Sequence, residues 1–96
     1  MSVYLVAQLR IDDRALLDKY VEKVIPSLKI GGGRIVAFDE TPDVIEGTTD
    51  YPRTVIIRFE DKEAFRTWYD SPEYQSIIQM RLDSAPGTVT VVNGLG

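Results

Sequence analysis

The side chains of this 96-residue chain that could take part in chemistry are carboxylates, phenols, guanidinium and ammonium groups, and hydroxyls. The chain contains no cysteine and no histidine. It therefore has no thiolate nucleophile, no serine–histidine–aspartate triad, no histidine general base and no conventional zinc site. Any acid–base or orienting work would fall to tyrosine, aspartate and arginine. We predict no metal and no cofactor.

The densest group of such side chains is the segment WYDSPEYQ, at residues 68–75. A serine beside an aspartate suggests a nucleophile, but without a histidine the segment cannot form a triad. Ser71, Pro72 and Glu73 have the residue types typical of the N-cap, the first and the second position of a helix. We therefore predict that the segment is a joint between two helices, with aromatic residues packing on both sides of it.

Three consecutive glycines, at residues 31–33, could suggest a phosphate-binding loop. Such a loop follows a strand and opens a helix. These glycines follow a predicted helix and precede a predicted strand, so helix termination is the favoured interpretation, with Gly31 or Gly32 in the left-handed conformation.

The connection around residues 39–50 is rich in acids that could supply oxygen ligands to Ca²⁺ or Mg²⁺. The acids are Asp39, Glu40, Asp43, Glu46 and Asp50. Their spacing matches no EF-hand loop, and a polar turn explains them more simply. A metal-dependent activity of this connection is our weakest hypothesis.

Hydropathy patterns predict the elements that must position these side chains. Alternating apolar residues predict strands at 3–10, 34–40, 53–60 and 88–94, and a short edge strand at 43–47. A first helix is expected to start at Asp12 or Asp13 and to bend or end near Pro26. A second helix should follow Asp61, and a third should follow Ser71.

The element order β-α-β-β-α-α-β is the pattern of a ferredoxin-like fold. We predict a single domain over residues 1–96 of class α+β, ferredoxin-like βαββα(α)β, with one antiparallel sheet and the helices on one face. The third helix is expected to bury one apolar side, formed by Tyr74, Ile77, Ile78 and Leu82.

Helices on one side leave the other face of the sheet uncovered. The residues expected on this open face are Tyr4, Val6, Gln8, Thr54, Ile56, Arg58, Thr88, Thr90 and Val92. A mixed apolar and polar patch of this kind marks an interface or a ligand site. We predict that two copies pair through it into a dimeric α/β barrel, and that its polar members line a pocket for a small organic molecule.

The candidate pocket residues combine polar strand residues with tyrosines. They are Tyr4, Gln8, Tyr20, Arg34, Asp39, Thr54, Arg58, Tyr69 and Tyr74. A phenol can donate a proton, although packing with the hydroxyl at a wet edge is the simpler interpretation. Arg34, Arg58 or the nearby Arg53 could hold a carboxylate by two hydrogen bonds, although a salt bridge to one of the 15 acids is simpler. Asp39 with Arg34 or Arg58 is the first pair to examine.

Several segments resemble the domain of unknown function 1330 (DUF1330) family over nearly the whole chain. They are YLVAQLRIDD, GGGR, VIEG, RTVIIRFED and, most specifically, WYDSPEYQ. The resemblance implies a homodimer similar to the dimeric α+β barrels, which include cofactor-free monooxygenases, muconolactone-isomerase-like proteins and stress-responsive barrel proteins. It implies no particular activity. Relatives tend to carry an acid where this chain has Arg58.

Composition narrows the class of partner. The net charge is −4 without a basic run, which argues against nucleic-acid binding. The apolar runs are far shorter than the roughly 20 residues that span a bilayer, and the first residues lack the features of a signal peptide. We therefore expect a cytoplasmic protein with no membrane association.

Two functions follow as hypotheses, and whether the protein is an enzyme stays open. The first is a homodimer that binds a small organic carboxylate or carbonyl compound. It would carry out cofactor-free proton abstraction, isomerisation or oxygenation. The second is a non-enzymatic stress or housekeeping binding module whose open sheet face is only a dimer interface.

Overall fold

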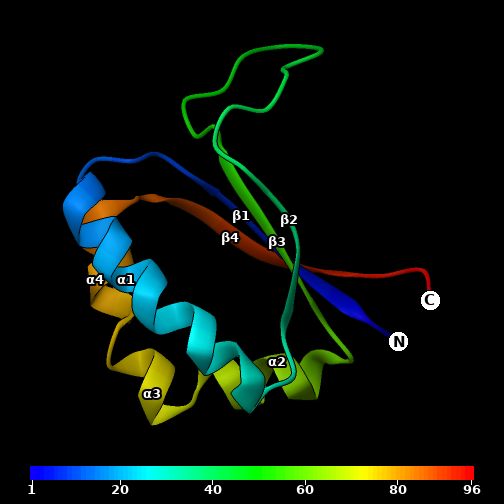
Figure 1. The fold of residues 1–96 in the computed structure, drawn as a ribbon. Helices are drawn as coiled ribbons and strands as arrows, with labels where there is room; N and C mark the ends of the chain where they lie inside the picture. Colours follow the sequence, from blue (N-terminus) through cyan, green and yellow to red (C-terminus); the bar gives the residue numbers. More distant parts are fainter.

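The computed structural model describes residues 1–96 and contains one four-stranded antiparallel sheet. The strands lie in the order β2-β3-β1-β4, and the helices cover one face of the sheet (Figure 1). The elements are β1 (Val3–Leu9), α1 (Arg14–Ser27), a 3₁₀ turn η1 (Leu28–Ile30), β2 (Arg34–Asp39), β3 (Arg53–Phe59), α2 (Lys62–Tyr69), α3 (Pro72–Gln75), α4 (Ile78–Ser84) and β4 (Gly87–Asn93). The predicted ferredoxin-like α+β fold is confirmed.

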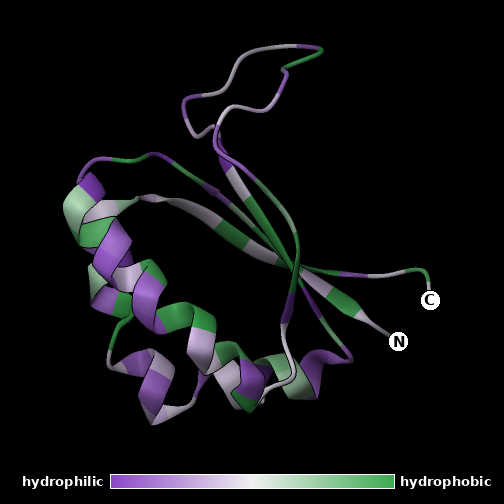
Figure 2. Cartoon of the chain, viewed as in Figure 1, coloured by the Kyte–Doolittle hydropathy of each residue, from purple (hydrophilic) through white to green (hydrophobic).

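The strand alternation separates the two faces as the sequence predicts. Val3, Leu5, Ala7 and Leu9 of β1 are buried beneath the helices. The residues between them point to the open face, where Gln8 is exposed. The hydrophobic residues gather on the strands, while the connection between β2 and β3 is mostly hydrophilic (Figure 2). We call the helix side of the sheet the covered face and the other side the open face.

Side-chain caps set the starts of the helices. The carboxylates of Asp13 and Asp61 accept the backbone N–H groups of Leu16 and Ala64, at 3.1 and 2.7 Å. Ser71 Oγ accepts the N–H of Tyr74 at 3.2 Å. These bonds satisfy amide groups that the first turn leaves without partners. The three predicted caps are confirmed.

The end of the first helix also follows its sequence. Pro26 lies in the last turn of α1, which ends at Ser27 and continues as η1. Gly32 adopts the left-handed conformation, with a φ of 67°. Gly33 has no room for a side chain, because a Cβ there would lie 2.8 Å from the Phe59 ring. The glycine run therefore ends the helix and lets the chain pass close to the core.

Two sequence predictions are wrong. The predicted third helix is two short helices, α3 and α4. Ser76 Oγ donates to the carbonyl of Glu73, and the N–H of Ile77 donates to the carbonyl of Tyr74. These bonds tighten the chain between α3 and α4 and interrupt the helix. This break turns Leu82 to solvent, where it is 47% exposed rather than buried. The predicted edge strand at 43–47 is absent. Residues 40–52 form an irregular loop that projects from the sheet and pairs with no strand (Figure 1).

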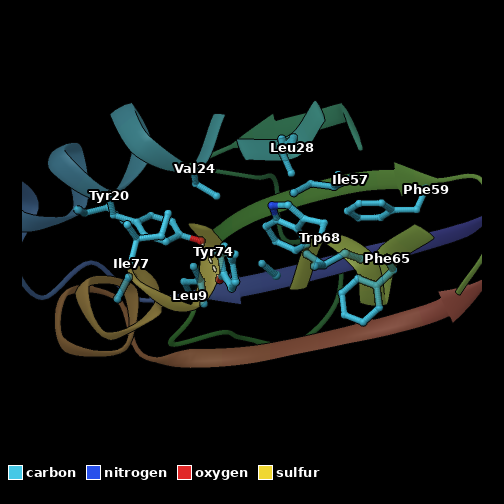
Figure 3. Packing of buried hydrophobic residues seen from close by; sticks show 14 of the residues in the cluster. Leu9, Tyr20, Val24, Leu28, Ile57, Phe59, Phe65, Trp68, Tyr74 and Ile77 are labelled. Atoms are coloured by element: carbon cyan, nitrogen blue, oxygen red, sulfur yellow. Dashed lines mark hydrogen bonds between the residues drawn. The ribbon is translucent and has the colours of Figure 1, made fainter. Parts of the chain in front are cut away.

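Aromatic side chains pack one end of the covered face. The rings of Phe59, Phe65 and Trp68 contact one another, and Trp68 also lies 4.2 Å from Tyr74, measured between ring centroids (Figure 3). The indole N–H of Trp68 donates to Ser27 Oγ at 2.9 Å. Both helices of the joint therefore anchor on the sheet through large rings whose polar atoms are satisfied.

Candidate functional site

A cavity of about 230 Å³ lies between the covered face and the helices. Of its 19 lining residues, 17 are hydrophobic. Strand residues such as Leu5 and Ile57 form its floor, and Leu17 and Val24 of α1 form part of its roof. Trp68 lies in its wall (Figure 3). An enclosed apolar space with a few polar groups has the character of a small-molecule site.

The cavity opens toward solvent between α1 and β2. Ile25, Ile35 and Phe38 all line it, and all three are exposed, Phe38 by 57%. Helix α1 packs mainly against α4 rather than against β2. A ligand would therefore reach the interior past these three apolar side chains.

Arg53 is one of two charged residues that line the cavity. It opens β3 on the covered face and is only 7% exposed. Its Nη1 donates to the Glu40 carboxylate, and its guanidinium stacks 4.7 Å from the centroid of the Phe38 ring. Its Nε is buried and has no hydrogen-bond partner. The Arg53 guanidinium therefore has one carboxylate partner, and its Nε–H is shut off from solvent without a partner.

Arg81, on α4, is the second charged lining residue. It is half-buried, and its Nη1 makes a long bond of 3.3 Å to the carbonyl of Ala85. Its Nε is also buried without a partner, and no carboxylate forms a salt bridge with it. Removing a cation from water without an opposite charge is unfavourable. The arrangement is explained if a bound anion supplies that charge.

Two buried tyrosines meet in the wall of the cavity. The hydroxyls of Tyr20 and Tyr74 lie 3.0 Å apart, and their rings pack edge to face (Figure 3). Burial raises the pKa of both phenols, while the positive charge of Arg81 opposes the rise at each. Both therefore stay protonated near neutral pH. Since one hydroxyl donates to the other, one O–H of the pair is left to donate to a ligand.

Glu40 connects the cavity wall to the start of α1. Its two carboxylate oxygens accept hydrogen bonds of 2.9 and 3.0 Å from Arg14, and one of them also accepts from Arg53. The bonds from Arg14 are the main reason that the pKa of Glu40 lies below its usual value. Glu40 is therefore ionised at neutral pH and held at two points.

The structure divides the predicted site residues between the two faces. Tyr20, Tyr69 and Tyr74 line the cavity. The other six lie on the open face in two rows that run across the strands. One row contains Arg34, Arg58 and Tyr4, and the other contains Asp39, Thr54 and Gln8. The cavity thus lies on the side of the sheet opposite to the predicted pocket, and a ligand role for these six residues stays a prediction.

The predicted pair of Asp39 with Arg34 or Arg58 is not formed within the chain. The Asp39 carboxylate accepts the backbone N–H of Thr41 at 2.9 Å and forms no salt bridge with an arginine. Arg34 and Arg58 face each other across β2 and β3 instead. Two like charges side by side repel each other, so this corner of the open face favours an acidic partner.

Arg81 and Glu40 were absent from the predicted site, and Arg53 was considered only as an arginine beside the connection. Alternation offered a signal for Arg53, because it shares the parity of Val55 and Ile57 and so belongs to the covered face. Arg81 lies four residues after the buried Ile77, but the helix break between them weakens a periodic argument. Glu40 was noticed only as one acid of the connection. Its link to Arg14 joins residues 26 positions apart.

The acids of the connection do not gather around a common point. No group of three or more histidine, cysteine, aspartate or glutamate side chains is arranged to hold a metal ion. No helix combines the length and apolar character needed to cross a membrane. The geometry therefore directs attention to the cavity.

Comparison with known proteins gives a family and a fold. The family model described as "Domain of unknown function (DUF1330)" matches residues 2–95. No curated protein sequence matches the chain. A protein of unknown function from Rhodopseudomonas palustris is similar in structure, with a TM-score of 0.82 and 15% identity over 99% of this chain and 83% of that one.

Two further solved structures extend the comparison. A dimeric ferredoxin-like protein of unknown function from Jannaschia sp. CCS1 has a TM-score of 0.75 and 16% identity, over 98% of this chain and 100% of that one. SnoaB, a cofactor-independent oxygenase from Streptomyces nogalater, has a TM-score of 0.67 and 14% identity, over 99% and 94%. At these identities the likeness establishes the shared fold alone.

Proposed function

This chain belongs to the DUF1330 family, and we propose that it binds a small organic anion, an apolar carboxylate or an enolate, in the cavity beneath its helices. The observation that carries the proposal is Arg81, a half-buried cation in an apolar cavity wall that forms no salt bridge with any acid of the chain. The cavity is smaller than the roughly 300–1,000 Å³ of sites for drug-sized ligands, which points to a compact molecule.

The polar groups of the cavity lie together and suit an anionic head group. Arg81 and Arg53 line the same cavity as the tyrosine pair. Each arginine supplies positive charge to the cavity wall, and the tyrosine pair offers one O–H. The apolar body of the ligand would then contact residues such as Trp68 and Val24.

The lining favours binding over proton abstraction. It contains no aspartate, glutamate or lysine, and its tyrosines are protonated near neutral pH. The cavity therefore supplies donors and positive charge without a general base. This supports the binding-module hypothesis.

The second candidate function is oxygenation of an already activated anion. SnoaB, a cofactor-independent oxygenase, has this fold, and the hydrogen-bond donors of the cavity would stabilise such an anion.

We also propose that two copies pair through their open faces, as dimeric solved proteins of this fold support. A middle row of the open face is mostly apolar and contains Ala37, Ile56 and Val6. It lies between the row of Arg34 and the row of Asp39. A twofold axis along the middle row would place each row that contains Arg34 over the partner copy's row that contains Asp39. Such a pair buries the apolar residues and matches opposite charges.

Titration of intrinsic fluorescence tests the proposed function. The chain has a single tryptophan, and it lies in the cavity wall, so a bound ligand should change its emission. We expect saturable binding of benzoate and a much weaker response to the neutral benzamide. Arg81→Met should weaken benzoate binding about 30-fold or more, because truncating one partner of a buried charge pair costs about 2–5 kcal/mol.

Arg10→Met is the matched control, because it removes the same charge from an exposed pair with Asp12. Its affinity for benzoate should equal that of the wild type. The proposal is overturned if no small carboxylate binds the wild type. It is also overturned if Arg58→Met abolishes binding while Arg81→Met does not, since the site would then lie on the open face.

A further inference from the structure

The charges around the cavity are unevenly paired. Arg53 has a carboxylate partner in Glu40, whereas Arg81 has none. Arg14 also binds Glu40, but its side chain is 54% exposed, so water screens its charge. The cavity wall therefore presents one compensated and one uncompensated cation to a ligand.

Glu40 cannot readily turn away from this arrangement. Arg14 binds both of its carboxylate oxygens, and Arg53 binds one of them from the cavity side. The Nη1 of Arg53 is thereby occupied, and the charge of Glu40 balances that of Arg53. A ligand carboxylate can use the remaining donors of Arg53 and Arg81, but a second negative charge on the ligand would meet the fixed charge of Glu40 without a free cation to balance it.

Resting on the function proposed above, we infer that Glu40 determines specificity by restricting the cavity to monoanions. Glu40 is a positioning residue in this role, since it does not line the cavity and acts through its charge and its bond to Arg53 rather than by touching the ligand. The substrate or ligand class is accordingly a compact apolar molecule with one negative charge, rather than a dicarboxylate or a phosphate ester.

A pair of size-matched probes tests the inference. Phthalate carries two charges near pH 7.5, and its monomethyl ester carries one on the same ring. Their dissociation constants can be measured by tryptophan fluorescence. We expect the wild type to bind the ester more tightly. Glu40→Gln should shift the ratio of the two constants about tenfold toward the dianion, the order expected when one nearby unit charge is removed.

Two further variants make the test decisive. Asp12→Asn removes a carboxylate from another two-point arginine pair and should leave the ratio unchanged. Arg14→Met removes a cation but keeps Glu40, so it should shift the ratio away from the dianion and serves if Glu40→Gln fails to fold. The inference fails if Glu40→Gln and Asp12→Asn give the same ratio while the ester still binds. If neither probe nor benzoate binds the wild type, the proposed function fails with it.

Discussion

The two faces of the sheet are built from the same strands, but their apolar residues are covered in different ways. On the covered face, residues such as Leu5, Ile57 and Phe59 are buried by helices from the same chain. On the open face, an apolar row centred on Ile56 and Val6 is flanked by arginines on one side and by polar residues on the other. The open face lacks a cover in one chain, whereas the covered face has one that leaves a cavity.

The difference shows that visible polarity is a poor guide to where a ligand site lies. The open face has many polar side chains, yet they can be met by water or by a second copy. The covered face has few, but Arg53 is almost fully buried, and the half-buried Arg81 beside the same cavity forms no salt bridge. A buried cation without a partner says more about a ligand than an exposed row of charges.

The largest expected effect is on the free energy of unfolding, and it compares the aromatic cluster of the covered face with the solvent-exposed mouth of the cavity. Phe59→Ala removes a ring with 0% exposure from the aromatic cluster and should lower the free energy of unfolding by about 3–5 kcal/mol. Phe38→Ala makes the same chemical change at the mouth, where the ring is mostly exposed. It should cost less than about 1 kcal/mol, chiefly the stacking with Arg53. Urea denaturation measures both.

Equal losses from the two phenylalanine variants would contradict this division. They would mean that the mouth is packed as tightly as the aromatic cluster, and the cavity would then have no access between α1 and β2. A small loss at Phe59 would place the stabilising core elsewhere.

The next effect concerns the open face. Ile56→Asp places a charge in the middle of the proposed dimer interface and should raise the dimer dissociation constant about 100-fold or more, which is about 2.7 kcal/mol or more. Leu82→Asp adds the same charge to an exposed position on α4 and should leave the dimer intact. Sedimentation equilibrium distinguishes the outcomes. A wild type that is monomeric at micromolar concentration would refute the pairing of the open faces.

Local patterns explain why so much of the fold could be predicted from the sequence. Alternation assigned the faces of the strands, and Asp13, Asp61 and Ser71 marked the helix starts, because caps act within a few residues. The break between α3 and α4 was missed. It depends on hydrogen bonds of Ser76 and Ile77 that compete with a continuous helix, and the residue types alone do not decide that competition.

The cavity was harder to predict for a different reason. Tyr20 and Tyr74 are 54 positions apart, and Arg14 and Glu40 are 26 apart, so the tertiary arrangement alone brings them together. A cavity also depends on the distance between a helix and the sheet, which no pattern of residue types records. Arg53 could have been assigned to the covered face by parity, but a charged residue there is more simply taken as the polar end of a strand.

The smallest expected effect concerns the Glu40 carboxylate, which links Arg14 to Arg53. The pKa of Glu40 is lowered in the folded protein, first by its hydrogen bonds from Arg14, from an ordinary value of 4.5. Because the folded state binds this proton less readily than the unfolded state, Glu40 contributes stability above pH 4.5. This contribution is lost as the pH falls through the lower, folded-state pKa. Comparison of Glu40→Gln with the wild type should therefore show a constant difference in unfolding free energy between about pH 5.5 and 7.5 that shrinks below pH 4.5.

The difference should be less than about 1 kcal/mol, because the pair with Arg14 is largely open to solvent and the ion pair is screened. Repeating the comparison in the Arg14→Met background identifies the cause. If Arg14 provides most of the effect, the pH-dependent part nearly disappears there, although Arg53 is still present. A pH dependence that survives in full would assign the stabilisation to Arg53 instead. Glu40 would then be bound chiefly to the covered face, and the start of α1 would be free to move away from the cavity.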